Sequence, residues 1–362
     1  MDDLEALLIL TSLPHIGSIK IRLLMQHYGS ASAALQAPLE EIATFPGFGP
    51  KILKAWKEGL EQEHWKDHLT LAERLQTQII SFTSPHYPKR LLEIADYPLV
   101  LYVQGNLLKE DQRCLAVVGT RQASLYGQEM AKDLSSKLAQ AGFTVVSGLA
   151  RGIDTAAHQG ALQVGRTVAV LGSGLACLYP TENIGLAGHI RQQGALISEF
   201  SMATPPDRQN FPQRNRIVSG MTMGTILIEA PRQSGAMLTA ERALSQGRPV
   251  FALPGRVDQD SFKGNHALIK ERKAELVENV EDILKTFDYS LPLVFQSAKV
   301  PSLPLEKEEE ELLRQMPTQE VSIEELVMSI SWPVAKLNGL LMSLVLKKRV
   351  KEYPGKIYKK FK

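Results

Sequence analysis

The chain has 362 residues, of which 44% are hydrophobic and 22% charged, and its formal net charge is +2. This composition is typical of a soluble globular protein of two or three domains, and no apolar run approaches the ~18 residues of a membrane span. Cys114 and Cys177 are too far apart in sequence to suggest a disulfide framework, and the acidic start lacks the basic segment of a signal peptide. We therefore expect a cytoplasmic protein that does not associate with membranes.

Residues 1–65 are predicted to form a helical domain with an internal repeat. Two turns, residues 13–18 and 45–50, share a proline, an apolar residue and a glycine, and their glycines Gly17 and Gly49 lie 32 positions apart (49 − 17). Each precedes an amphipathic run whose first N–H groups could face a phosphate. The pair resembles tandem helix-hairpin-helix modules, which bind DNA without reading sequence. A packing module with tight glycine turns is the alternative, and both interpretations stay open.

Residues 66–288 are predicted to form an α/β domain with a parallel sheet. Residues 78–82 and 98–105 read as strands, and three apolar runs that end at glycine follow, at 115–119, 143–148 and 167–174. Segments of helix length separate these three runs, which is the pattern of a βαβαβ unit. Buried parallel strands need such continuous runs of Val, Leu and Ile.

The glycine turns that follow these strands predict a phosphate-bearing ligand. In an open α/β sheet the turns line the crevice beyond the carboxyl ends of the strands, where helix N-termini attract anions. The first turn holds Arg121, which suits bidentate phosphate contact, but neither a G-x-G-x-x-G nor a P-loop motif is present. Ordinary dinucleotide binding and P-loop ATP hydrolysis are therefore disfavoured. Structural turns without a ligand remain the alternative at any one position.

The second half of the domain continues the alternation of strands and helices. Strands are predicted at 195–198, 225–229 and 250–255, with a helix at 237–246. Residues 200–216 are polar and rich in proline, so they read as a long loop before the apolar run that starts at Ile217.

The rest of the chain is predicted to be a linker and a small C-terminal domain. Residues 289–304 contain three prolines and read as the linker. Three helices and a hairpin in residues 305–362 predict a winged helix. Its cations, which include Lys336, Lys347, Lys348 and Arg349, could contact DNA, but domains of this size also dock proteins.

No motif in the sequence calls for catalysis. His64 and His68 lie outside an H-E-x-x-H context, no G-x-S-x-G elbow occurs, and acids such as Asp154, Glu199 and Glu229 suit helix capping. We therefore expect a protein that is not an enzyme and that uses no metal or other cofactor.

Basic residues gather near the predicted carboxyl edge of the sheet, with Phe211 and Tyr126 among them. Such a set fits single-stranded nucleic acid, because arginines can contact the phosphates and aromatic rings can stack on the bases. Each stacked base contributes ~1–3 kcal/mol to binding. Alternatively, some of the arginines pair with Asp207, Glu199 or Glu229, and Arg151 beside Asp154 is the first expected pair. The basic residues are Arg121, Arg151, Arg208, Arg214, Arg216, Arg232 and Lys263.

In these and neighbouring residues the sequence resembles the DNA-processing protein A family, also called DprA or Smf. The resemblance covers about residues 80 to 285, and the order and spacing of its motifs are specific. The matching stretches are Gly119–Arg121 with Ser124 and Tyr126–Gly127, Ser147–Leu162, Tyr179–Pro180 with Asn183, Phe211–Ile217, Ser234–Gly235 with Thr239–Ala240, and Pro254–Gly255 with Gly264–His266.

The resemblance implies an extended Rossmann fold that forms a homodimer and binds single-stranded DNA in a basic pocket. It also implies loading of a RecA-type recombinase during natural transformation and recombination. Gly148, Ser234 and Gly235 would allow close backbone approach in that pocket. Its other residues would be Arg121, Arg208, Phe211, Arg214, Asn215, Arg216 and Lys263.

This chain departs from the family pattern at two positions. Ala176 lies at or near the place of a usual Asp, and Asn265 stands where a Cys is common. The first change removes a possible helix cap, but neither change removes a basic residue.

Two other functions remain open from the sequence. A nucleoside-monophosphate phosphoribohydrolase is echoed by Met223–Thr225 and Glu229, although the Pro-Gly-Gly of that enzyme group is missing. A transcription regulator would use the winged helix to read duplex DNA and the Rossmann domain as a ligand sensor.

Overall fold

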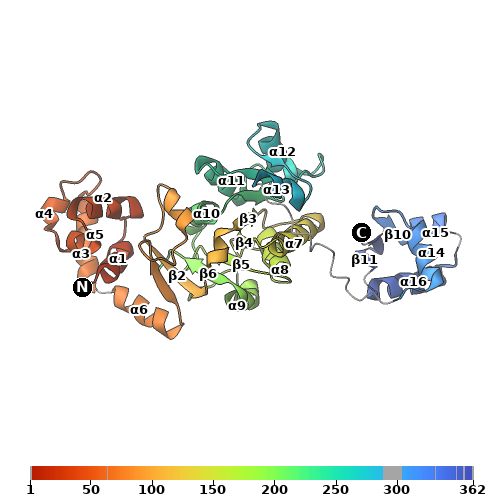
Figure 1. Ribbon diagram of the computed structural model, residues 1–362, viewed down its shortest axis with the longest axis horizontal. Helices are drawn as coiled ribbons and strands as arrows, with labels where there is room; N and C mark the ends of the chain where they lie inside the picture. The colour runs from red at the N-terminus through yellow and green to blue at the C-terminus, as the bar shows by residue number, and fades with distance from the viewer. Residues whose placement is uncertain are drawn as a thin grey trace. The chain divides into compact units, whose positions relative to one another are not determined.

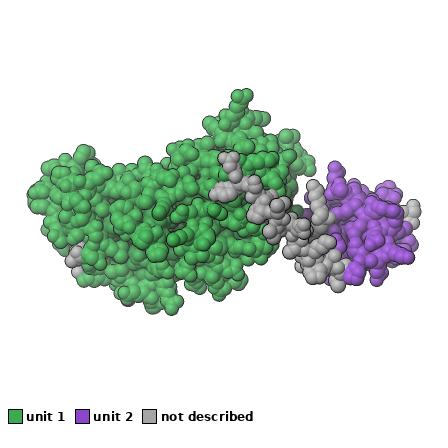
Figure 2. Space-filling view, in the orientation of Figure 1, with its two compact units in different colours: residues 1–291 green, residues 292–362 purple. Residues whose placement is uncertain are grey.

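The computed structural model describes residues 2–62, 64–287, 304–330, 332–347, 349–353 and 355–360. These form two compact units, residues Met1–Leu291 and Pro292–Lys362 (Figure 2). Apart from Pro304, the predicted linker lies outside the described residues. The predicted boundary between residues 65 and 66 falls inside the first unit and stays a prediction.

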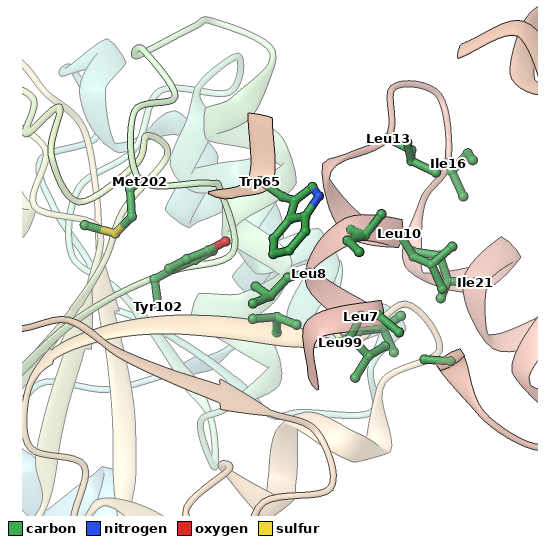
Figure 3. Packing of buried hydrophobic residues seen from close by; sticks show 14 of the residues in the cluster. Leu7, Leu8, Leu10, Leu13, Ile16, Ile21, Trp65, Leu99, Tyr102 and Met202 are labelled. Atoms are coloured by element: carbon green, nitrogen blue, oxygen red, sulfur yellow. The ribbon is translucent and has the colours of Figure 1, made fainter. Parts of the chain in front are cut away.

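The N-terminal part of the first unit is helical. Helix α2 begins directly after Gly17 and α5 directly after Gly49, so both repeated turns start a helix. Side chains of the first helix, Leu7 and Leu8, belong to the same hydrophobic cluster as Leu99 and Tyr102 (Figure 3). The helices are α1 (Asp3–Ser12), α2 (Ser18–Tyr28), α3 (Ala31–Gln36), α4 (Leu39–Ile42), α5 (Pro50–Gln62) and α6 (His64–Arg74).

The centre of the first unit is a nine-stranded sheet with the order β1-β2-β6-β5-β4-β3-β7-β8-β9. Figure 1 labels the strands from β2 to β6 of this sheet. All neighbours from β6 to β9 pair in parallel, whereas β2 is antiparallel to β6 and β1 to β2. The predicted parallel sheet is confirmed. The strands are β1 (Gln78–Ser81), β2 (Val100–Gly105), β3 (Cys114–Val118), β4 (Thr144–Ser147), β5 (Thr167–Val170), β6 (Ala195–Ser198), β7 (Thr225–Leu227), β8 (Val250–Ala252) and β9 (Glu275–Leu276).

The apolar strands are buried because helices cover both faces of the sheet. Along β3, Leu115 and Val117 pack in the cluster that holds residues of α7 (Leu125–Gln140), α8 (Ile153–Ala161) and α13 (Val280–Thr286). The intervening Ala116 and Val118 pack in the cluster that holds α10 (Asn210–Gly220) and α11 (Gly235–Ser245). Successive side chains point to opposite faces of a strand, so the uninterrupted apolar runs match a three-layer fold.

The strand order places a topological switch at β3. The chain moves from β3 through β4 and β5 to β6 on one side, and then returns to β7 on the other side of β3. Loops beyond the carboxyl ends of β3 and β7 therefore diverge and leave a crevice, which is where α/β proteins bind ligands.

One local prediction was wrong. Residues 210–220 form α10, although the sequence had suggested a loop up to residue 216. Pro212 is the third residue of this helix, and the N–H groups of a first turn have no helical partner, so proline is tolerated there. The prolines in this segment therefore led to the prediction of a loop where a helix begins.

The second unit has the predicted winged-helix elements. Its three-stranded sheet has the order β10-β12-β11, and its helices and strands enclose a separate cluster that contains Leu312, Leu326 and Leu341. The elements are α14 (Lys307–Gln315), β10 (Val321–Ser322), α15 (Ile323–Ser329), α16 (Val334–Leu346), β11 (Val350–Tyr353) and β12 (Ile357–Lys360). Among the described residues of both units, no helix is long and apolar enough to cross a membrane.

Candidate nucleic-acid interface

A cleft of about 650 Å³ opens at the switch point of the sheet. Its walls are the turn after β3, from Val118 to Gln122, the turn after β4, which contains Gly148, and the segment between β7 and α11. Helix α10 supplies the remaining wall. Eight residues predicted for the binding site line this cleft, and they are Arg121, Gly148, Arg208, Phe211, Arg214, Asn215, Ser234 and Gly235.

Helix α10 presents one face to the cleft. Phe211, Arg214, Asn215 and Val218 all line it, and their spacing of i, i+3, i+4 and i+7 places them on one side of a helix. The Nδ2 group of Asn215 donates to the carbonyl oxygen of Gly235 at 3.2 Å and so ties α10 to the start of α11.

Arg214 is buried against the carboxyl ends of β4 and β5. Its side chain donates to the carbonyl oxygen of Val170, and a Cβ atom at position 148 would overlap its guanidinium, so any larger residue there would displace the Arg214 side chain. Burial lowers the pKa of Arg214 to about 10, against the opposing effect of the Asp154 carboxylate. Arg214 remains charged at neutral pH and gives the floor of the cleft a positive charge.

Asp154 holds the turn on which Arg214 rests. Its Oδ2 atom accepts hydrogen bonds from the backbone N–H groups of Gly148 and Ala150, at 3.1 and 3.3 Å. Burial raises the pKa of Asp154, while Arg214 and these N–H groups act in the opposite direction. Asp154 therefore shapes the turn after β4, and the expected pair with Arg151 is replaced by a pair between Arg151 and Glu182.

Arg121 and Phe211 form a cation–aromatic pair at the mouth of the cleft. The Cζ atom of Arg121 lies 4.9 Å from the centre of the Phe211 ring, and the Arg121 side chain is exposed. The Tyr179 ring lies 5.9 Å from that of Phe211 at an interplanar angle of 39°. A cation and two rings are thus adjacent on a surface that is open to solvent.

Tyr179 was not predicted as a site residue. It lines a small side pocket that shares Arg121, Phe211 and Arg214 with the main cleft, and 37% of its surface is exposed. Its position in Tyr179–Pro180, a stretch that carries the family resemblance, could have identified it as a site residue. It lies 32 positions before Phe211 in the sequence (211 − 179).

Two predicted site residues do not line the cleft. Arg216 forms ion pairs with Glu199 and with Asp96, the latter at 3.5 Å, and its side chain is only 13% exposed. Lys263, the first residue of α12 (Lys263–Lys270), is exposed and pairs with Asp260. The expectation that Glu199 would engage one of the arginines is confirmed by its pair with Arg216.

Glu229 lies near the cleft and bonds to the residue before α7. Glu229 is 1% exposed, and its Oε2 atom accepts from the N–H and the hydroxyl of Ser124, at 3.0 and 2.7 Å, just before α7. This residue echoed a nucleotide-hydrolysing motif, but it does not line the cleft. The described residues also contain no cluster of His, Cys, Asp and Glu that could hold a metal ion.

Comparison with known proteins identifies the family. Residues 78–288 match the model of DNA recombination-mediator protein A, and residues 296–356 match the DprA winged helix domain. Protein Smf of Escherichia coli is 45% identical over 221 residues, which are 60% of this chain and 59% of that protein.

Two solved structures resemble this chain. DNA processing protein A of Streptococcus pneumoniae has a TM-score of 0.69 and 33% identity, over 80% of this chain and 99% of that one. DNA processing protein A of Helicobacter pylori has a TM-score of 0.54 and 29% identity, over 59% of this chain and 98% of that one. The extended Rossmann-like core agrees with these structures, the winged helix agrees with the domain match over residues 296–356, and the chain belongs to the DNA recombination-mediator protein A family.

Proposed function

We propose that the cleft binds single-stranded DNA and that the protein acts as a non-catalytic mediator of DNA processing and recombination. The adjacent Arg121, Phe211 and Tyr179, above the buried charge of Arg214, are the observation that carries this proposal. Cations that contact phosphates and rings that stack bases are the two elements of single-strand binding.

The exposed Tyr179 ring and the half-buried Phe211 ring favour a single strand over a duplex. Phe211 and Tyr179 can stack only on a base whose face is free, and in a duplex the neighbouring base pairs cover both faces. The N-terminus of α11, at Ser234 and Gly235, also lines the cleft. Backbone N–H groups at a helix start attract phosphate without reading the base.

The comparisons support the same class of ligand. The Helicobacter pylori protein has a single-stranded DNA binding mode, and curated relatives in Bacillus subtilis and Streptococcus pneumoniae are named DNA processing proteins. We extend this role to a homodimer that protects incoming DNA and loads a RecA-type recombinase during natural transformation, on the strength of the family resemblance.

Fluorescence anisotropy with a labelled poly-dT oligonucleotide and the matching duplex, at several salt concentrations, tests the binding proposal. The wild type should prefer the single strand. Arg121→Ala should weaken binding and reduce the slope of log affinity against log salt by about 0.7, the value for one phosphate contact on a single strand. Tyr179→Ala should weaken binding with little effect on that slope, because stacking releases no counterion.

Lys109→Ala is the matched control. Lys109 is exposed in the short helix before β3, so it lies at the opposite end of that strand from the cleft, and its loss should leave affinity unchanged. Duplex binding equal to single-strand binding and insensitive to Arg121 would contradict the proposal.

A further inference from the structure

The outer face of α16 in the winged-helix unit is an uninterrupted apolar stripe. Ala335, Gly339, Met342 and Leu346 are all exposed, and their spacing of i, i+4, i+7 and i+11 aligns them along one side of the helix. Met342 is 58% and Leu346 74% exposed. The opposite side of α16 holds the fully buried Leu337, Leu341 and Leu344.

Helix α16 is therefore apolar on two opposite faces, which is unusual for a helix at the surface of a small domain. A surface helix normally buries one apolar face and exposes a polar one. Only three of its thirteen residues, Lys336, Asn338 and Ser343, carry polar side chains. An exposed apolar face with this regularity marks an interaction surface.

The charges around the stripe do not suit a nucleic-acid backbone. The stripe contains no Lys or Arg. The Nζ atom of Lys336 pairs with Glu308 at 2.6 Å, and that of Lys347 pairs with Glu309 at 2.7 Å. Lys348, a further predicted DNA contact, lies outside the described residues. A protein surface fits this face better than a phosphate backbone does.

The side chains of the stripe are ordered by size. The small residues Ala335 and Gly339 occupy its first half, and the large residues Met342 and Leu346 its second half. Nothing lies within 4 Å of the position that a Cβ atom would take at Gly339, so a partner side chain could rest directly on the backbone there. A partner helix with the same order of small and large residues, running in the opposite direction, would place its large side chains on Ala335 and Gly339.

We infer that the partner of this stripe is a second copy of the chain, bound through antiparallel packing of α16 on α16. A two-fold axis midway along the stripe brings each residue opposite the partner residue for which the two residue numbers sum to 681. Met342 of one copy then lies over Gly339 of the other (339 + 342), and Leu346 lies over Ala335 (335 + 346). Each large side chain then meets a small one. Such an interface is self-complementary and closes as a dimer.

The antiparallel direction also follows from the flanking charges. The same axis brings Lys336 close to the partner's Val345, and Lys347 close to the partner's Val334 (336 + 345 and 347 + 334 are also 681). No like charges meet. A parallel pair would oppose Lys336 to Lys336 and leave a void between the two Gly339 residues.

The proposed contact is small. A helix of 13 residues is about 20 Å long, and one helix pair buries less than the roughly 800 Å² per partner of a typical stable complex. The interface is therefore weak by itself and gains strength where two chains are already held together, for instance on one DNA strand.

Disulfide trapping in the full-length chain tests this inference. Ala335→Cys and Leu346→Cys are made in separate, differently tagged chains that also carry Cys177→Ser, and the two are mixed under mild oxidation. The mixture should form a mixed disulfide rapidly. Each variant alone should not, because its two sulfurs would be separated by eleven residues (346 − 335), about 16 Å along the helix axis, beyond the reach of a disulfide.

A control pair uses Met328→Cys, on α15 and 88% exposed, with Leu346→Cys. Introduction of Met342→Glu into both chains should abolish the mixed disulfide, because a carboxylate would then be buried against the partner's backbone at Gly339. The inference is overturned if the 335/346 mixture forms no more mixed disulfide than the control pair, or if Met342→Glu leaves the yield unchanged.

Discussion

At the scale of single residues, buried polar groups hold the strand ends that shape the cleft. Asn265 is fully buried. Its Nδ2 group donates to the carbonyl oxygens of Leu227, Ile228 and Leu253, and its Oδ1 atom accepts from the N–H of Ala230 at 2.9 Å. The amide thus joins the ends of β7 and β8.

His158 gives the first unit a pH-dependent stability. It is fully buried, its Nδ1 atom lies 2.7 Å from the Thr167 hydroxyl, and burial, assisted by Arg214, lowers its pKa to about 3. The unfolded chain binds a proton near pH 6.5, so between these values the unfolded state holds more protons. The contribution of His158 to stability should therefore be complete above pH 6.5, and below that pH it should be lost at about 1.4 kcal/mol per pH unit.

Urea unfolding of the wild type and of His158→Gln between pH 4.5 and 7.5 measures this effect. The variant lacks the titrating group, so its free energy of unfolding should fall less steeply with decreasing pH. Equal slopes for the two proteins would show that His158 does not contribute.

At the scale of elements, one face of α10 lines the cleft and the other face anchors the helix to the rest of the unit. Phe211, Arg214 and Asn215 line the cleft, whereas Arg216 lies on the other side of the helix and pairs with Glu199 and Asp96. Nearby arginines thus have different roles, because successive residues of a helix point about 100° apart. Arg216 anchors α10, and Arg214 supplies charge to the site.

Arg216→Gln is expected to destabilise the first unit by about 3 kcal/mol, because it leaves the Glu199 carboxylate buried without its partner. Chemical denaturation measures the loss. Single-strand affinity of the folded protein should stay close to that of the wild type.

The double variant Arg216→Met with Glu199→Leu should recover most of this stability, since a buried pair can be replaced by apolar residues at little cost. A large loss of single-strand affinity in folded Arg216→Gln would instead place Arg216 in the interface.

At the scale of the whole molecule, each of the two units has a hydrophobic core of its own. In the second unit, Glu309 fastens α14 to α16. Its carboxylate accepts from the Ser343 hydroxyl at 2.5 Å and from Lys347 at 2.7 Å, and it also accepts from the N–H of Glu306. Although burial raises the pKa of Glu309, these hydrogen bonds lower it to about 2, so the carboxylate is ionised at neutral pH.

Separate cores predict two unfolding transitions in calorimetry of the full chain. Glu309→Ala removes hydrogen bonds to a charged group, worth about 2 kcal/mol, and should lower the midpoint of the second unit by roughly 10 °C. The transition of the first unit should not move. A single transition that shifts as a whole would show that the two units unfold together.

The sequence by itself determined the parallel sheet, the helical start, the winged helix and the family. These depend on local patterns, such as apolar runs that end at glycine, and on motif spacing, both of which can be read from neighbouring residues. The family resemblance also named eight of the residues that line the cleft.

Only the tertiary structure decided which basic residues share the cleft. Pro212 obscured the start of α10, and without the phase of that helix Arg214 and Arg216 look alike. Tyr179 reaches Phe211 across the fold, and the strand order alone brings the turns after β3, β4 and β7 together. Contacts of this kind join residues that are distant in sequence, so they follow from the packing of whole elements and from no local pattern.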